Sequence, residues 1–271
     1  MLKIENRLIL LSTKTTKIMQ TSFSELTDSQ WQVIDKIIDD QRKRKHSLRT
    51  IINAIFSLNS SGVQWRSLDS KYPSWQTVFY HFTQFKLKGI WENILDSVVE
   101  NERKRQGRQD SPSLLAIDSQ SVKKVQFTNE ETGIDGGKNV NGRKRTIIVD
   151  SLGLPWSIKV TAANISDNQA GILAVDLLNG KVPRLKKITA DSGYKVAFKE
   201  HVETNYAWQV EVMQKPESTT GFIPQKGRWQ VERSFGWLNF RRRLFRDVEK
   251  TILSAEAMLQ VAFISLIINR I

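Results

Sequence analysis

The sequence contains no cysteine and only three histidines. Without thiols there can be no disulfide framework, no zinc–thiolate centre and no cysteine nucleophile. The histidines, His46, His81 and His201, lie far apart in the sequence and lack the spacing of metal ligands. These two shortages exclude thiol catalysis and argue against a zinc site.

Long hydrophobic runs are also missing. The run from Leu8 to Leu11 is too short for the core of a signal peptide. The most apolar stretch, residues 253–271, is interrupted by polar side chains, and two of them, Glu256 and Gln260, share one helical face. We therefore expect a core helix with one polar side rather than a membrane span, and a soluble intracellular protein without a membrane partner.

Positive charge, by contrast, is abundant. Lysine and arginine number 41 against 28 aspartates and glutamates, which gives a formal net charge of +13 and a pI of about 9.9. A polyanion is the expected partner of such a chain. The 39% of hydrophobic residues is enough for a folded core, and 271 residues suit one large domain or two modest ones.

Four helical patterns follow a tail of residues 1–22, which shows no periodicity and is expected to be weakly ordered. The first helix follows a capping box at residues 27–30, the second ends at Gly62, the third begins after Ser74 and the fourth carries Trp91 and Ile94. With basic residues between them, these helices predict a small all-α, helix-turn-helix-like domain over residues 23–102. The polar tract 103–113 is the expected linker.

The sequence character changes after this linker. Apolar runs at 114–117, 146–149, 156–160, 187–190 and 209–213 predict strands. Residues 167–178 and 196–205 predict helices, and two long helical patterns finish the chain. Strands that first follow one another and then alternate with helices indicate an α/β domain with a mixed sheet over residues 114–271.

Three aspartates follow apolar strands: Asp118, Asp150 and Asp191. Asp150 leads into a tight connection, and antiparallel pairing of its strand with the one before Asp118 would separate the two carboxylates, so we interpret Asp150 as a turn residue. If the strands before Asp118 and Asp191 are parallel neighbours, their carboxylates come within reach of one cation. The alternative, that both acids only cap the next element, stays open.

Glu232 is a third candidate acid because it falls among the apolar residues of a helical pattern. An acid on an apolar helix face needs a partner, since an unpaired buried charge is costly. A metal ion is one such partner. Ion pairing with Arg228 or Arg233 alone is the other.

Around these acids, a series of short stretches occurs in a distinctive order. They are Leu26–Trp31, Gly62–Arg66, Trp75–Phe82, Ile117–Lys123, Gly133–Lys138, Asn141–Arg145, Val149–Asp150, Ala190–Tyr194 and Arg228–Arg233. In this order and spacing they resemble the bacterial insertion-sequence transposases of the DDE type, specifically the IS-five-like group. The resemblance covers the chain from Leu26 to its C-terminus.

The resemblance implies an RNase H-like catalytic domain in which Asp118, Asp191 and Glu232 form the DDE triad. Two divalent ions would lie between these carboxylates, Mg²⁺ with Mn²⁺ as a substitute. The implied activity is that of a transposase that binds the element's terminal inverted repeats, cuts the DNA at the element's ends and joins them to target DNA. The implied partners are double-stranded DNA and further copies of the chain, in a homodimer or larger assembly, in the bacterial cytoplasm at the nucleoid.

Three positions depart from the pattern of the resembled family. Gln225 stands in place of a tyrosine, Asn239 in place of a basic residue, and Ser192 in place of a glycine. Arg228 keeps the arginine of that pattern. The arginines that follow at 241–243 are candidates to replace the charge missing at Asn239.

Basic residues gather near the three acids. Residues 226–246 hold seven basic side chains and one acid, and shorter clusters lie at 123–124 and 143–145. DNA phosphates that approach the metals would meet all three clusters, and polar side chains of the third helix are candidates for reading base edges. The predicted DNA contacts are Lys123, Arg143, Lys144, Arg145, Arg228, Arg233, Arg241, Arg242, Arg243, Gln76, Thr77 and Tyr80.

The leading hypothesis is thus a metal-dependent DNA transposase. The alternative is a domesticated transposase that acts as a sequence-specific DNA-binding regulator without catalysis, and a metal-dependent nuclease without strand transfer is a third hypothesis. The three retained acids argue against the regulator, since a binding protein gains little from negative charge clustered near DNA.

Overall fold

The computed structural model describes residues 23–40, 42–128, 130–213 and 229–270, so the predicted tail lies outside the described residues. The α-helices are α2 (Asp28–Ile38), α3 (Leu48–Ser61), α4 (Trp75–Leu87), α5 (Ile90–Arg105), α6 (Asp167–Asp176), α7 (Val196–Tyr206), α8 (Trp229–Leu238) and α9 (Ile252–Ile268). The strands are β1 (Leu114–Lys123), β2 (Gly133–Asp135), β3 (Val140–Asp150), β4 (Pro155–Ala162), β5 (Lys187–Ala190) and β6 (Gln209–Val212). Two short 3-10 helices, η1 (Trp65–Ser67) and η2 (Arg242–Leu244), complete the description.

Local chemistry accounts for the start of α2 and the end of α3. Thr27 forms the capping box of α2 with Gln30, and α3 ends at Gly62, whose φ of 75° suits a residue without a Cβ. Ser74 occupies the N-cap position of α4, but its hydroxyl bonds to Thr77 Oγ1 at 3.0 Å instead of capping the backbone. The predicted helices of this region are confirmed.

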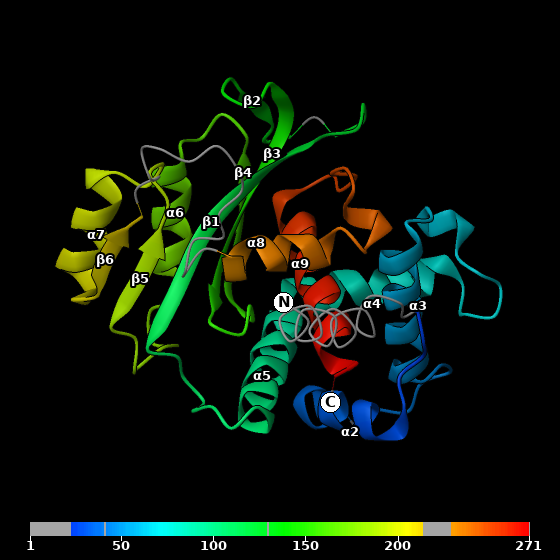
Figure 1. Ribbon diagram of the computed structural model, residues 1–271. Helices are drawn as coiled ribbons and strands as arrows, with labels where there is room; N and C mark the ends of the chain where they lie inside the picture. Colours follow the sequence, from blue (N-terminus) through cyan, green and yellow to red (C-terminus); the bar gives the residue numbers. More distant parts are fainter. Residues whose placement is uncertain (1–22, 41, 129, 214–228, 271) are drawn as a thin grey trace, which may run out of the picture.

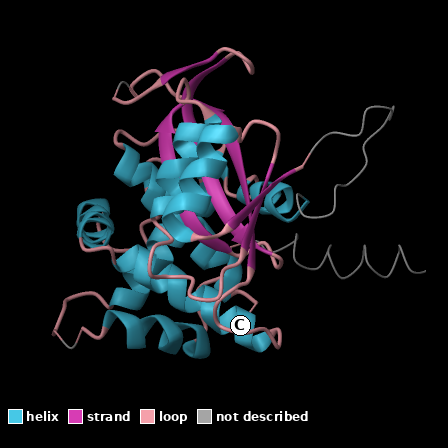
Figure 2. Ribbon diagram, turned by 90° about the vertical axis from the view of Figure 1, so that its left-hand side faces the viewer, coloured by secondary structure: helices cyan, strands magenta, loops and turns pink. Residues whose placement is uncertain are grey.

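A mixed sheet forms the centre of the second half of the chain. β1 pairs antiparallel with β3, β3 pairs antiparallel with β4, and β1, β5 and β6 run parallel to one another. The parallel crossovers through α6 and α7 place these two helices together on one side of the sheet, while α8 and α9 lie on the other (Figures 1 and 2). This arrangement confirms the predicted α/β class; the short β2 was not predicted.

The hydrophobic core runs without interruption from the first helices to the last. α9 packs against α3, α4 and α5 as well as against β4, and Asn59 of α3 donates to the carbonyl of Met258 at 3.2 Å. Glu256 lies on the polar side of α9, where its carboxylate pairs with Lys159 at 3.0 Å and accepts the backbone N–H of Val160. No helix in the described ranges is long and apolar enough to cross a membrane.

The predicted linker is partly helical and firmly attached. α5 continues through Arg105, into the tract predicted as a linker, because Arg103 is buried and pairs with the carboxylate of Asp150 while its Nε donates to the carbonyl of Gln109 at 2.8 Å. The division of the chain at 103–113 stays a prediction. The continuous core gives a physical reason to expect that both parts fold together.

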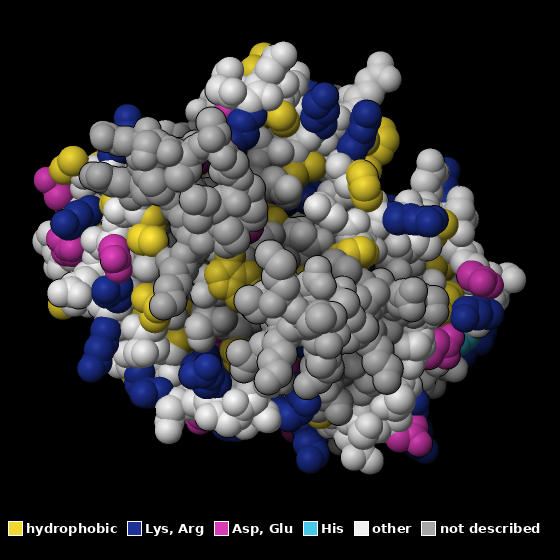
Figure 3. All heavy atoms as spheres, viewed as in Figure 1, with side chains coloured by type: hydrophobic (Ala, Val, Ile, Leu, Met, Phe, Trp, Pro, Cys, Tyr) yellow, Lys and Arg dark blue, Asp and Glu magenta, His cyan; other side chains and the backbone are white. Residues whose placement is uncertain are grey.

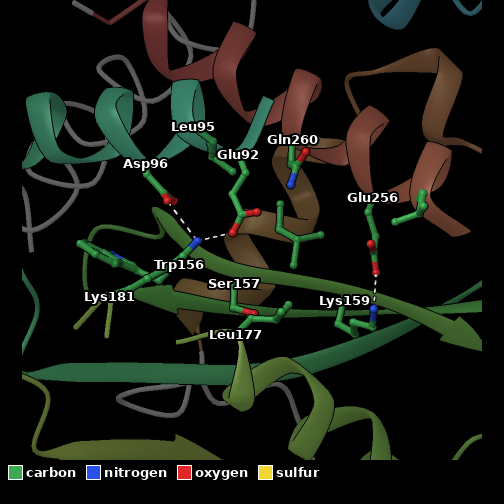
Figure 4. Close-up of a pocket in the computed structure, with 12 residues that line it drawn as sticks. Glu92, Leu95, Asp96, Trp156, Ser157, Lys159, Leu177, Lys181, Glu256 and Gln260 are labelled. Atoms are coloured by element: carbon green, nitrogen blue, oxygen red, sulfur yellow. Dashed lines mark hydrogen bonds and ion pairs between the residues drawn. The ribbon is translucent and has the colours of Figure 1, made fainter. Parts of the chain in front are cut away.

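A cavity of about 230 Å³ lies between α5, the free edge of β4 and α9 (Figure 4). Lys181 reaches across it to Glu92 and Asp96 of α5, with 3.0 Å between Lys181 Nζ and Asp96 Oδ2. Lys159 is paired with Glu256 on the opposite wall. Both lysines at this cavity are therefore already neutralised, and the contacts fasten α5 to the loop after α6 rather than forming a binding site.

We predict that a fragment of residues 1–112 does not fold on its own. It lacks α9, which covers α3, α4 and α5, so these helices would expose the apolar faces that they bury in the full chain. Urea unfolding followed by far-ultraviolet circular dichroism should show one cooperative transition for the full chain and none for the fragment. A cooperative transition of the fragment would instead establish an independent N-terminal domain.

Candidate active site

Asp118 and Asp191 lie on neighbouring parallel strands. β1 and β5 pair from Leu114 and Lys187 to Ala116 and Thr189, and the same register continued by two residues places Asp191 beside Asp118. The parallel arrangement that the sequence analysis made a condition for a shared cation is therefore present. Asp118 does not end its strand, however, because β1 continues to Lys123 along its antiparallel partner β3.

The direction of the side chains follows from the alternation along β1. Ser119 is buried and points toward Tyr194, on the side of the sheet covered by α6 and α7, so Asp118 points to the opposite side, where α8 lies. One oxygen of each aspartate accepts a backbone N–H: that of Ser119 at 2.7 Å for Asp118, and that of Gly193 at 2.8 Å for Asp191. Both carboxylates are half-buried.

Gly193 lies between two carboxylates. A Cβ at this position would lie 2.9 Å from Asp167 Oδ2 and 3.0 Å from Asp191 Oδ1, so only glycine leaves both acids in place. Asp167, in the first turn of α6, is an acid that the sequence analysis did not select. It is paired with Lys144 Nζ at 2.7 Å, which neutralises its charge beside Asp191.

Tyr194 carries a buried hydroxyl close to these acids. Its oxygen is 2.8 Å from Ser119 Oγ, which in turn is 2.9 Å from Thr146 Oγ1 on β3. Burial raises the pKa of Tyr194 well above its usual range; the hydrogen bond with Ser119 opposes this rise, and the nearby charges of Asp118, Asp167 and Asp191 add to it. The phenol therefore stays protonated at neutral pH.

Glu232 lies in the first turn of α8, which packs against β1 and β3. The core side of this helix is formed by Val231, Ser234 and Phe235, whereas Glu232 is exposed, so the prediction that it sits among core-facing residues is wrong. Within the described ranges, no three His, Asp or Glu side chains converge closely enough to hold a metal ion. The structure thus brings Asp118 and Asp191 together but not all three acids.

Asp150 has the turn role that the sequence analysis gave it. Its Oδ1 accepts the backbone N–H groups of Leu152 at 2.8 Å and Leu154 at 3.0 Å, and its other oxygen pairs with Arg103 and accepts from the indole of Trp156. The antiparallel register sets Asp150 opposite Leu115, three residues before Asp118. Asp150 is therefore an anchor between β3 and α5.

The cluster at 143–145 is buried, which corrects its predicted role as a DNA contact. Arg143 is fully buried and pairs with Asp247 at 3.2 Å, and it also donates to backbone carbonyls that include that of Glu249. Arg145 donates to the carbonyl of Leu244, and burial lowers its pKa to about 10. Together with Lys144, these side chains organise the protein interior and offer no surface to a phosphate.

The arginines that follow α8 are partly buried and partly exposed. Arg241 and Arg243 are buried, and Arg243 pairs with Glu249 at 2.8 Å, so neither is retained as a DNA contact. Arg242 is exposed. Arg233 stacks between Trp229 and Trp237, with 4.2 and 4.9 Å to the two ring centroids. Arg228 and Gln225 lie outside the described residues.

Other predicted contacts are at the surface. Lys123 is exposed and lines an open depression with Lys124 and Arg246. In α4, Gln76 and Tyr80 are exposed and Thr77 is half-buried. Thr77 and Tyr80 line a second depression with the basic residues 42–45.

The chemistry of the paired aspartates fits a hard divalent cation. Asp118 and Asp191 offer carboxylate oxygens, which Mg²⁺ and Mn²⁺ prefer, and the missing Cβ at Gly193 keeps the space beside Asp191 open. Two protein carboxylates are also the usual complement for Mg²⁺, which keeps water and phosphate oxygens as its remaining ligands.

Comparison with known families identifies two matching regions. The family described as "Transposase DDE domain" matches residues 109–268, and the family described as "Putative transposase of IS4/5 family (DUF4096)" matches residues 26–95. A comparison with curated proteins gave no match. The first match spans the mixed sheet with its helices, which agrees with the predicted RNase H-like fold.

We predict that Asp150→Ala lowers the free energy of unfolding by about 3–5 kcal/mol, because it leaves the buried Arg103 guanidinium without its charge partner. Asp110→Ala is the matched control, since Asp110 forms an exposed pair with Lys104 at 3.4 Å and such pairs contribute at most about 1 kcal/mol. Urea unfolding of both variants measures the difference. Equal stability of the two would contradict the anchoring role of Asp150.

Proposed function

The chain belongs to the DDE-domain transposases, and on this premise we propose that it catalyses metal-dependent cleavage and joining of DNA at the ends of an insertion sequence. The observation that carries the proposal is the placement of Asp118 and Asp191 on neighbouring parallel strands. A protein that only binds DNA gains nothing from two carboxylates held side by side next to basic surfaces.

Asp118, Asp191 and Glu232 are the proposed metal ligands. Divalent ions bound by these carboxylates would supply Lewis-acid activation of the attacking water or 3′-hydroxyl and stabilisation of the leaving oxygen. The side-chain alternation of β1 supports Asp118 as a ligand on the side of α8, the helix that carries Glu232. Glu232 is exposed in the first turn of that helix, which packs against β1 and β3.

The first proposed DNA surface lies at the end of β1. A backbone β-bridge joins Lys124 to Asp247. The exposed side chains of Lys123 and Arg246 therefore line one depression, and Phe245 beside them is 71% exposed. Figure 3 shows dark blue Lys and Arg side chains with hydrophobic side chains among them in the upper right, where Figure 1 places this end of β1. Cationic and aromatic groups together suit phosphates and bases.

The second proposed surface is in the helical region. The basic residues 42–45 lie beside Thr77 and Tyr80 of α4, and Tyr80 is 58% exposed. With Gln76 exposed on the same helix, these side chains provide both phosphate contacts and groups that read base edges. We assign recognition of the terminal inverted repeats to this surface, and we expect two or more copies of the chain on paired DNA ends.

We predict that Asp118→Asn, Asp191→Asn and Glu232→Gln each reduce cleavage and joining by more than about 100-fold, because loss of a direct ligand exceeds the 10–100-fold typical of an outer partner. The assay uses a supercoiled plasmid with the element's ends and Mg²⁺, and chelation should abolish the reaction. Asp176→Asn, an acid at the end of α6, is the control and should keep activity.

The same variants should keep DNA binding in a gel-shift experiment. Joining that persists in all three variants would refute the proposed catalytic site. Specific binding without any cleavage by the unaltered chain would instead favour the DNA-binding regulator.

We predict that Lys123→Gln and Arg246→Gln each weaken DNA binding and reduce the slope of log affinity against log salt by about 0.9 for each phosphate that the variant no longer neutralises. Lys199→Gln, an exposed lysine that is 50% accessible on α7, is the control. Fluorescence anisotropy at several salt concentrations measures both quantities. An unchanged slope for both variants would place the DNA elsewhere.

A further inference from the structure

We propose that Tyr194 is a positioning residue that sets the separation of Asp118 and Asp191 through its hydroxyl bond to Ser119. This inference rests on the proposed function, because it concerns the two carboxylates that are to hold the divalent ions. Tyr194 itself touches neither DNA nor metal in this proposal.

The bond joins the two segments that carry the acids. Ser119 directly follows Asp118 on β1, and Tyr194 follows Asp191 by three residues. The hydrogen bond of 2.8 Å between the Tyr194 and Ser119 hydroxyls therefore links the two chain segments that carry the acids. β5 itself ends at Ala190, so Asp191 lies beyond the last backbone pairing with β1. The side-chain bond thus extends the connection between the segments beyond the point where the strand pairing stops.

The ring of Tyr194 has little freedom to move. It is fully buried, it packs edge-on against Phe198 at 5.1 Å, and the glycine at 171 lies so close that a Cβ there would be 2.6 Å from Tyr194 Cε1. Ser119 is held from its other side by Thr146 at 2.9 Å. Because each partner is held from its other side, the hydroxyl bond joins two well-packed groups and ties the position of one acid-bearing segment to that of the other.

Removal of the hydroxyl alone tests this role. Tyr194→Phe keeps the packed ring, and Ser119→Ala breaks the same bond from the strand side. Tyr206→Phe is the matched control, since Tyr206 donates its O–H to Asp176 at 2.8 Å near the surface. Mn²⁺ binding to the full chain is measured by electron paramagnetic resonance, together with the urea midpoint of each variant and the Mg²⁺ concentration needed for cleavage.

We expect Tyr194→Phe and Ser119→Ala to weaken Mn²⁺ binding by about 10–100-fold and to raise the Mg²⁺ requirement, with midpoints close to that of Tyr206→Phe. The double variant should bind no more weakly than the weaker single variant, because both remove one interaction. Wild-type Mn²⁺ affinity in Tyr194→Phe or Ser119→Ala would overturn the proposal, as would losses that add fully in the double variant. A lowered midpoint with unchanged affinity would show a merely structural role and also overturn it.

Failure of this inference can be told apart from failure of the proposed function. If Asp118→Asn and Asp191→Asn abolish Mn²⁺ binding while Tyr194→Phe leaves it unchanged, only the positioning role is wrong. If the two aspartate variants bind Mn²⁺ like the unaltered chain, the metal site itself is wrong, and the role of Tyr194 falls with it.

Discussion

The buried pair of Arg143 and Asp247 is the interaction on which the arrangement of the catalytic half depends. The guanidinium sits in the interior and also holds the carbonyls of Glu130, Glu249, Lys250 and Thr251, which fixes the segment between α8 and α9 to β3. A buried charge that loses its partner costs about 3–5 kcal/mol, so this segment has one placement on the sheet. The end of β1, the course of the chain after α8 and the start of α9 all follow from it.

This constraint explains why basic residues near an active site need not contact its substrate. Several arginines close to the acids in sequence are buried, namely Arg143, Arg145, Arg241 and Arg243. Exposed positive charge is carried by other positions such as Arg246. The net charge of the chain therefore overstates the positive charge at its surface. Exposed basic side chains remain at the end of β1, in the helical region and elsewhere, for example Lys199 on α7.

The sequence predicted the elements well because their signals are local. The capping box at Thr27, the glycine at 62 and the apolar run that became β5 each report on a few neighbouring residues. The adjacency of Asp118 and Asp191 could be stated only as a condition, because strand order is a property of the whole sheet. Burial of Arg143 was missed, since its partner Asp247 is distant in sequence, and Asp167 was missed because an acid in a helix's first turn is ordinarily a helix-stabilising residue.

The position of α9 has a consequence at the level of the gene. α9 covers α3, α4 and α5 and so completes the core that these helices begin among themselves. A nonsense or frameshift mutation before α9 would therefore leave the apolar faces of α3, α4 and α5 exposed to water.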